Sequence, residues 1–159
     1  MRQLVHTIKI RVFEKNQAHL DSIEALFHEL LPVNFEKENL SIDHEQMEGL
    51  THTMIHSYNL TLKKQRHTIL FLHTLFDHLN ENDKQCLYEQ RDLRLDDEGQ
   101  FYLRLDKQQL LHHVYHLTET GDCFHVTIKL AAFPAKRDNF LATLEVLFSD
   151  LGYHSPENQ

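Results

Sequence analysis

Side chains that could bind a nucleic acid recur in stretches of alternating sequence at 4–13, 101–106 and 126–133. In a strand, every second side chain points to the same face. The polar positions of these stretches carry cations beside aromatic rings: Lys9, Arg11, Tyr102, Arg104 and Lys129, with Lys63 nearby and Phe13 and Phe133 at strand ends. Cations bind phosphates and rings stack on unstacked bases, which is how several folds hold RNA. The same residues also fit an exposed sheet face that meets only water, so both interpretations stay open at this point.

A second candidate anion site lies where segment 126–133 turns into a helix. Pro134 is typical of a first helical position, so Lys136 and Arg137 are expected in the first turn. Cations at this end oppose the helix dipole, which costs stability unless an anion binds there. A phosphate would meet free backbone N–H groups together with two positive side chains. The alternative is that both cations simply point into water.

The 14 histidines raise the question of a metal site. His112, His113 and His116 form the densest cluster, and His52 and His56 are four residues apart. In a strand, residues 112 and 116 would lie more than ~12 Å apart, too far to share one ion. In a helix they could meet a metal, but no acid or cysteine at fixed spacing completes the set. We therefore expect no bound metal.

Motifs that carry catalysis are absent from the sequence. The chain has only four glycines, no phosphate-binding glycine loop, no nucleophile and base pair, and no zinc-protease helix. Asp96 and Asp97 stand beside a turn, and the simplest interpretation is that they are solvated turn residues. The sequence predicts neither an enzyme nor a cofactor. A metal-dependent enzyme would require stoichiometric metal in the purified chain.

Composition limits the organisation and the partners of the protein. A length of 159 residues predicts a single domain over 1–152 with a flexible tail at 153–159. The net charge of −8 argues against coating nucleic acid by bulk attraction, so RNA would need a local patch, and no DNA partner is expected. Cys86 and Cys123 have no CxxC partner and are expected to be buried or idle thiols. No apolar run approaches a membrane span and the N-terminus alternates, which predicts a cytoplasmic location without membrane contact.

Hydrophobic periodicity predicts strands and helices in mixed order. Extended segments with a period of two are expected at 4–13, 40–44, 54–62, 101–106, 111–118 and 126–133. Amphipathic helices are expected from the N-cap Asn16 to Pro32, over 65–79, from the N-cap Asn82 to about Arg91, and from Pro134 to Gly152. The predicted fold is α+β, a two-layer sandwich with a largely antiparallel sheet of about five to six strands and helices packed on one face.

Two motifs in fixed order connect this chain to a known family. Residues 102–108 read YLRLDKQ, Gly121-Asp122 follows, and residues 128–137 read IKLAAFPAKR. This arrangement resembles the archaeal RNA-binding family that is also described as predicted exosome subunits. With the first strand and helix included, the resemblance extends over about residues 5–150.

The resemblance implies a fold similar to a large-subunit ribosomal protein that holds 5S ribosomal RNA. It also implies RNA binding without catalysis, associated with RNA processing or the exosome. The matching positions are Arg104, Asp106, Lys107, Lys136 and Arg137, with Lys9 and Lys129 matching less distinctively. Asp106 is expected to be structural and to pair with Lys107 or Arg137. The alternative hypothesis is a protein-interaction module that joins a complex, or a homodimer, through a sheet edge or an apolar surface.

Overall fold

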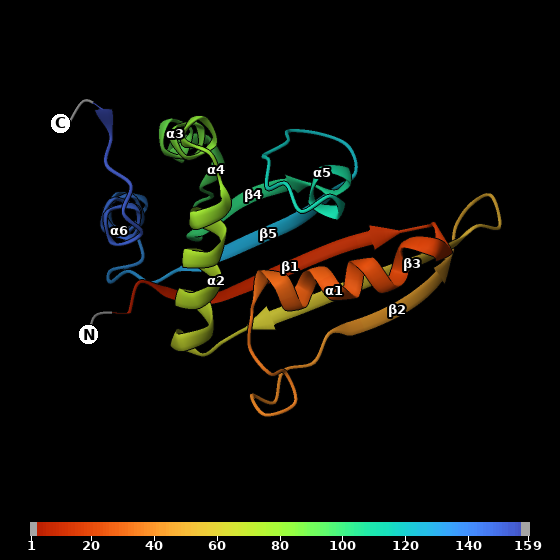
Figure 1. The fold of residues 1–159 in the computed structure, drawn as a ribbon. Coiled ribbons are helices and arrows are strands. Elements are labelled where there is room, and N and C mark those ends of the chain that lie inside the picture. The colour runs from red at the N-terminus through yellow and green to blue at the C-terminus, as the bar shows by residue number, and fades with distance from the viewer. Residues whose placement is uncertain (1–2, 157–159) are drawn as a thin grey trace.

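A five-stranded antiparallel sheet organises the chain in the computed structural model, which describes residues 3–156. The strand order is β2-β3-β1-β5-β4, so the first strand lies in the centre (Figure 1). The strands are β1 (Val5–Glu14), β2 (Asp43–Glu48), β3 (Met54–Leu62), β4 (Gln100–Asp106) and β5 (Cys123–Leu130). The helices are α1 (Leu20–Leu30), α2 (Gln65–His78), α3 (Glu81–Glu89), α4 (Arg91–Arg94), α5 (Lys107–Leu111) and α6 (Arg137–Asp150), with a short 3-10 helix η1 over Gln17–His19.

Alternation along β1 separates a buried face of the sheet from an open one. Ile8, Ile10 and Val12 are fully buried, whereas Lys9 and Arg11 between them are exposed. The same alternation runs along the neighbouring strands β4 and β5. Because successive side chains of a strand point to opposite faces, the polar residues of all these strands gather on one side. The sheet is therefore covered on one side only.

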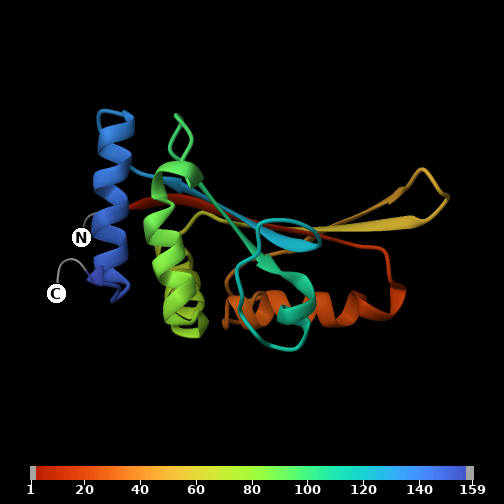
Figure 2. The ribbon, with the colours of Figure 1, turned by 90° about the horizontal axis from the view of Figure 1, so that it is seen from above.

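Helices supply the cover for the buried face. Figure 2 shows α1, α2 and α5 on one side of the sheet, with α6 standing at one end. The ring of Phe27 on α1 lies 5.7 Å from that of Phe124 on β5 and 6.4 Å from that of Tyr58 on β3. The predicted α+β class, with an antiparallel sheet and helices on one face, is confirmed. Between residues 3 and 156, no helix is both long enough and apolar enough to cross a membrane.

Strand β2 leaves one edge of the sheet open. All six of its residues are exposed, and it pairs with β3 alone. Asp43 and Glu45 stand in register with Asn59 and Ser57, on the same side of the sheet as Arg11. Charged side chains on an edge strand hinder pairing with another sheet.

Helix starts differ from the sequence prediction at two places. Helix α3 begins after Asn80, whose side chain accepts a hydrogen bond of 2.7 Å from the backbone N–H of Asp83, and not after Asn82. Helix α6 begins at Arg137, so Pro134 lies three residues before it rather than at its first position. The predicted placement of Lys136 in the first turn is also wrong, because this residue is the extended N-cap.

Two further segments are more compact than expected. Segment 111–118 was predicted as extended, but α5 takes up its start and only Leu117 forms a bridge, to Leu105. Tyr153 is buried, with its ring 5.4 Å from that of Tyr88, so the predicted flexible tail at 153–159 begins as packed structure. Residues 157–159 lie outside the described residues. The division of the chain at residue 152 stays a prediction.

Gly99, before β4, has a backbone conformation and a neighbour that together require glycine. Its φ is +85°, and an added Cβ would lie 2.4 Å from the buried ring of Phe140. Gly121 has the same φ of +85° but open space around it.

Replacing either glycine by alanine should lower the free energy of unfolding by about 1–2 kcal/mol, because a side chain disfavours the left-handed backbone conformation. Only Gly99→Ala must also displace a packed ring. We expect Gly99→Ala to lower the free energy of unfolding by about 1–3 kcal/mol more than Gly121→Ala in urea titrations followed by circular dichroism. Equal losses in the two variants would contradict this account.

Candidate nucleic-acid interface

The open face of the sheet brings predicted cations of β1 and β4 into two adjacent rows. In one row, Arg11 lies opposite His125 on β5, and His125 lies opposite Arg104 on β4. In the next row, Lys9 and Tyr102 are related in the same way through β5. Neighbouring strands are ~4.8 Å apart, so each row spans about 10 Å from β1 to β4. The antiparallel register thus gathers residues that are about ninety positions apart in the sequence.

These rows form the floor of a groove with a volume of about 600 Å³, called the sheet groove below. Leu93 and Arg94 of α4 line it on one side, as do Thr118 and Glu119 from the segment before β5. Four cations line the groove against one carboxylate, that of Glu119: Lys9, Arg11, Arg94 and Arg104. The groove is therefore locally positive in a chain whose net charge is −8.

Lys9 and Arg11 are two groove cations whose charge is not offset by a carboxylate within residues 3–156. Both are exposed, and neither forms an ion pair with any of residues 3–156. The Nε of Arg11 donates a hydrogen bond of 3.0 Å to the amide oxygen of Asn59, which is a neutral partner. This bond directs the guanidinium across the sheet and leaves its two terminal nitrogens for a ligand. These two side chains can bind an anion without first breaking an ion pair.

Arg94 and Arg104 are tied to the wall of the groove. Arg94 forms an ion pair of 2.8 Å with Glu119 and a hydrogen bond of 2.7 Å to the side chain of Gln90. Arg104 donates a hydrogen bond of 2.6 Å to the backbone carbonyl of Glu119. Because a carbonyl carries no net charge, Arg104 keeps its positive charge while its position is fixed.

Tyr102 and Lys129 have partners at the end of the groove near β4. The hydroxyl of Tyr102 donates a hydrogen bond of 2.9 Å to Asp96, which raises the pKa of the tyrosine. Burial alone would raise the pKa of Asp96, but hydrogen bonds from Gln100, Tyr102 and Glu98 outweigh it and the pKa is lowered. The amino group of Lys129 donates to the carbonyl of Glu98 and lies 5.7 Å from the ring centre of Phe140. Lys129 is outside the residues that line the groove.

His125 lies between Arg11 and Arg104 in the floor of the groove. Burial lowers the pKa of His125 below its ordinary value, and the positive charges of Arg104 and Arg11 lower it further. Its Nε2 is 3.5 Å from the sulfur of Cys123. The protein therefore holds a neutral imidazole between two cations, and an anion bound there would favour the charged form.

Lys107, which was predicted as an RNA-binding residue, is buried and paired within the chain. It is 2% exposed, its amino group pairs with Glu14, and it also lies 2.8 Å from a carboxylate oxygen of Asp122. Asp106 is structural as expected but by another route: its side chain caps α5 by accepting a bond of 2.9 Å from the N–H of Gln109. The expected pairing of Asp106 with Lys107 or Arg137 is wrong.

The predicted anion site at the start of α6 is neutralised by the chain itself. Arg137 donates to the carbonyls of Leu95 and Asp92, and it lies 3.8 Å and 3.7 Å from the carboxylates of Asp92 and Asp97. Lys136 is exposed beside it and has no ion pair within residues 3–156. These contacts fasten α6 to the α4 segment, so Arg137 is satisfied without an external phosphate.

The remaining predicted residues lie apart from the sheet groove, with one exception. Lys63 is exposed and lines a different hollow together with Lys64 and Glu38. Phe133 lies beyond the end of β5 and is 98% exposed, so it is not part of the sheet face. Phe13, the other predicted aromatic, lines the groove.

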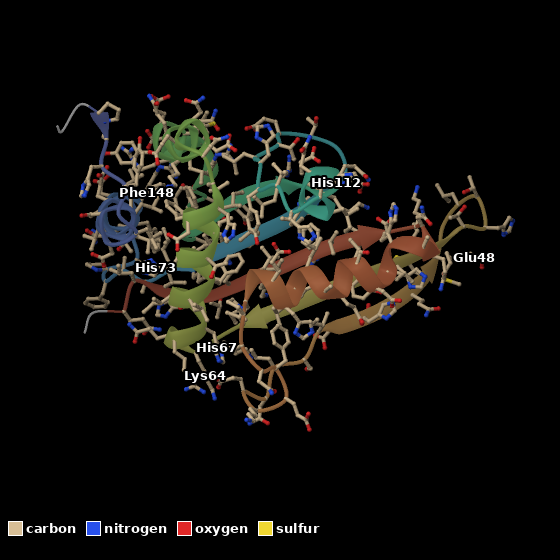
Figure 3. All side chains as sticks on the ribbon, viewed as in Figure 1. Glu48, Lys64, His67, His73, His112 and Phe148 are labelled. Atoms are coloured by element: carbon tan, nitrogen blue, oxygen red, sulfur yellow. The ribbon has the colours of Figure 1, made fainter. Side chains whose placement is uncertain are left out.

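The histidines that are clustered in the sequence are dispersed in the structure. His113 approaches Glu29 at 2.8 Å, His116 approaches Asp83 at 3.1 Å, and His112 ends α5 (Figure 3). His56 contacts His44 at 2.8 Å, away from His52 at the β2–β3 turn. Within residues 3–156, no three histidine, cysteine or acidic side chains come together in a way that could hold a metal ion.

Arg94, Asn59 and His125 can bind a phosphate and line the groove, but they were not predicted from the sequence. Arg94 belongs to a helix of only four residues, and such a short helix has no period that marks its face. Asn59 and His125 do alternate with apolar residues on β3 and β5, so the period-two pattern could have included them. They were missed because only cations and rings were counted, although an amide and an imidazole also bind phosphates.

Comparisons with known proteins identify the family of this chain. RNA-binding protein PAB1135 of Pyrococcus abyssi is 32% identical over 138 residues, which cover 84% of this chain and 86% of that protein. Mth689, a DUF54 protein from Methanothermobacter thermautotrophicus, has a similar fold, with a TM-score of 0.71 at 22% identity over 91% of this chain and 98% of its own. SSO0741 from Sulfolobus solfataricus reaches a TM-score of 0.64 at 19% identity over 91% of this chain and 98% of its own. The model of a family described as RNA binding matches residues 7–130, and the chain therefore belongs to this RNA-binding family.

Proposed function

We propose that this protein binds RNA in the sheet groove and catalyses no reaction on it. The observation that carries the proposal is the pair of exposed cations Lys9 and Arg11, which have no ion pair within residues 3–156, on a groove floor that the sheet register fixes. The chain's membership of an RNA-binding family and its relative from Pyrococcus abyssi support an RNA ligand.

The groove suits a phosphate backbone because its cationic donors are separate from one another and can each bind a different phosphate. Arg11 presents a planar fork that can bind one phosphate through two hydrogen bonds, whereas Lys9 offers a compact point charge. Arg104 lies in the same row as Arg11, at about 10 Å across the sheet. Successive phosphates of one strand can therefore meet separate cations along the floor. Binding would release counterions and would be strongly dependent on salt.

A binding role without catalysis is supported by what lines the groove. Its one carboxylate, Glu119, is already paired with Arg94. His125 has the cations Arg11 and Arg104 on either side and no acid opposite it in the register that could orient it as a base.

We do not include Lys107 and Arg137 in the proposed site, because both are held by carboxylates of the chain itself. Lys63, Lys129 and Lys136 lie outside the groove and are proposed only as peripheral phosphate contacts. The association with RNA processing or the exosome, the likeness to a 5S-RNA-binding ribosomal protein and the cytoplasmic location stay predictions.

Neutralising the two free cations should weaken RNA binding and reduce its dependence on salt. We expect the double variant Lys9→Gln/Arg11→Gln to reduce the slope of log affinity against log salt concentration by about 1.4, since each lost contact to a single strand removes about 0.7. Fluorescence anisotropy with a labelled 12-nucleotide RNA over a series of salt concentrations measures this slope.

Lys37→Gln is the matched control, because Lys37 is an exposed cation in the loop after α1 and does not line the groove. We expect its slope to equal that of the unaltered protein. If the double variant and the control reduce the slope by the same amount, the groove is not the binding site. If the unaltered protein shows no salt-sensitive binding at low ionic strength, the proposed function is wrong.

RNA binding should also raise the pKa of His125. In the free protein this pKa is below its ordinary value, because burial and the charges of Arg104 and Arg11 disfavour the imidazolium. Phosphates on the two arginines would offset that repulsion, so the complex takes up a proton as the pH falls from neutral and affinity increases over the same range. NMR titration of the His125 ring with and without RNA measures the shift. An unchanged pKa of His125 in a saturated complex would contradict the proposed position of the phosphates.

A further inference from the structure

The open face of the sheet continues beyond the sheet groove into a second hollow. Phe13, near the end of β1, lines both of them. The second hollow has a volume of about 580 Å³ and includes Met47 of β2 and Ile55 of β3, which are paired in register. We call this hollow the Phe13 pocket. The two hollows therefore share a boundary at one aromatic side chain.

The Phe13 pocket is apolar where the groove is cationic. Phe13 is 38% exposed and Met47 is 45% exposed, so both leave apolar surface open to water. Apolar side chains that gather at an exposed hollow mark contact sites more often than isolated ones do. Methionine adapts its shape and makes favourable contacts with aromatic rings. The pocket is thus suited to a flat, largely apolar group.

The buried lysine that lines the pocket is not free to bind a phosphate. Lys107 lies there with its charge matched by Glu14 and Asp122. A phosphate in the pocket would meet these carboxylates, whereas a nucleobase carries no charge. The exposed side chains of Lys15 and Gln108 stand at the rim and can bond to the polar edge of a base.

We infer that the Phe13 pocket receives the base of an unpaired nucleotide whose backbone lies in the sheet groove, so the ligand is single-stranded RNA. This inference rests on the proposed function. Arg11 and Phe13 are two residues apart on the same face of β1, a separation of ~6.8 Å, so a phosphate on Arg11 leaves its base within reach of the Phe13 ring. In a duplex the bases are paired and stacked inside the helix and cannot enter such a pocket. The charge next to the pocket favours RNA over a protein partner as its occupant.

The test compares unpaired and paired RNA on the intact protein. A labelled 12-nucleotide single strand and a hairpin containing the same strand in duplex form are titrated by anisotropy. We expect the protein to prefer the single strand by about tenfold or more, and Phe13→Ala to remove most of this preference, as stacking on one ring is worth about that factor. Phe13→Tyr keeps a ring and should restore the preference, and Met47→Ala should reduce it partly.

Two controls separate stacking from loss of fold. Val146→Ala removes a partly exposed apolar side chain on α6, away from both hollows, and should leave binding unchanged. All variants are checked by thermal unfolding before titration. A strand with one 2-aminopurine reports stacking directly, since its fluorescence should be quenched by the unaltered protein and by Phe13→Tyr but not by Phe13→Ala.

The outcomes distinguish this inference from the function on which it rests. Equal affinity for single strand and duplex, with both weakened by Lys9→Gln/Arg11→Gln, would leave RNA binding intact and overturn the inference. Sedimentation showing a dimer or a protein complex that Phe13→Ala dissociates would also overturn it, because the pocket would then bind protein. An absence of salt-sensitive binding to either RNA would overturn the proposed function first.

Discussion

Burial of one face of the sheet is the constraint on which the rest of this structure depends. Ile8, Ile10 and Val12 are completely removed from water, and each such side chain contributes roughly 1.5–3 kcal/mol when buried. A slip of one residue along β1 would expose all of them, so the core fixes the register. The same register fixes Lys9 and Arg11 on the opposite side. Selection for a stable core and selection for a defined cationic face thus act on alternate residues of one strand.

The cations of this chain have two different roles, and only the tertiary structure shows which cation has which role. Lys107 and Arg137 hold elements together. Lys107 forms a buried ion pair with Glu14, and removing one partner of such a pair typically costs about 3–5 kcal/mol. Arg137 acts through hydrogen bonds to the carbonyls of Leu95 and Asp92. Within residues 3–156, Lys9 and Arg11 form no ion pair, and Arg11 donates a hydrogen bond to the amide of Asn59. The protein therefore offsets cations where elements meet and leaves them free over the open sheet.

The elements were predictable wherever one period dominates the sequence. Strands β1 and β5 alternate over eight residues or more, and α2 carries its apolar residues at helical spacing, so their existence and type followed from pattern alone. The sequence also indicated which side chains share the open face. It could not show that Arg137 meets Asp92, forty-five positions away, or that Arg94 lies on the wall of the groove. Such contacts depend on how short, aperiodic segments such as α4 pack, which no local pattern reports.

The acidic edge of the sheet has a consequence for the direction in which a polyanion can lie. Strand β2 carries Asp43 and Glu45 on the open side, with Asp43 in the row that contains Arg11 and Glu45 in the row of Phe13. Glu48 lies at the outer end of β2 (Figure 3). These carboxylates repel a phosphate chain, so the sheet is polarised from a negative rim at β2 to a positive half at β1, β5 and β4. If a strand of RNA crossed toward β2, its favourable contacts with β3 would be offset by repulsion between its phosphates and these carboxylates. The carboxylates of β2 therefore favour a path for the phosphate chain over β1, β5 and β4 and give the open face a preferred direction of binding.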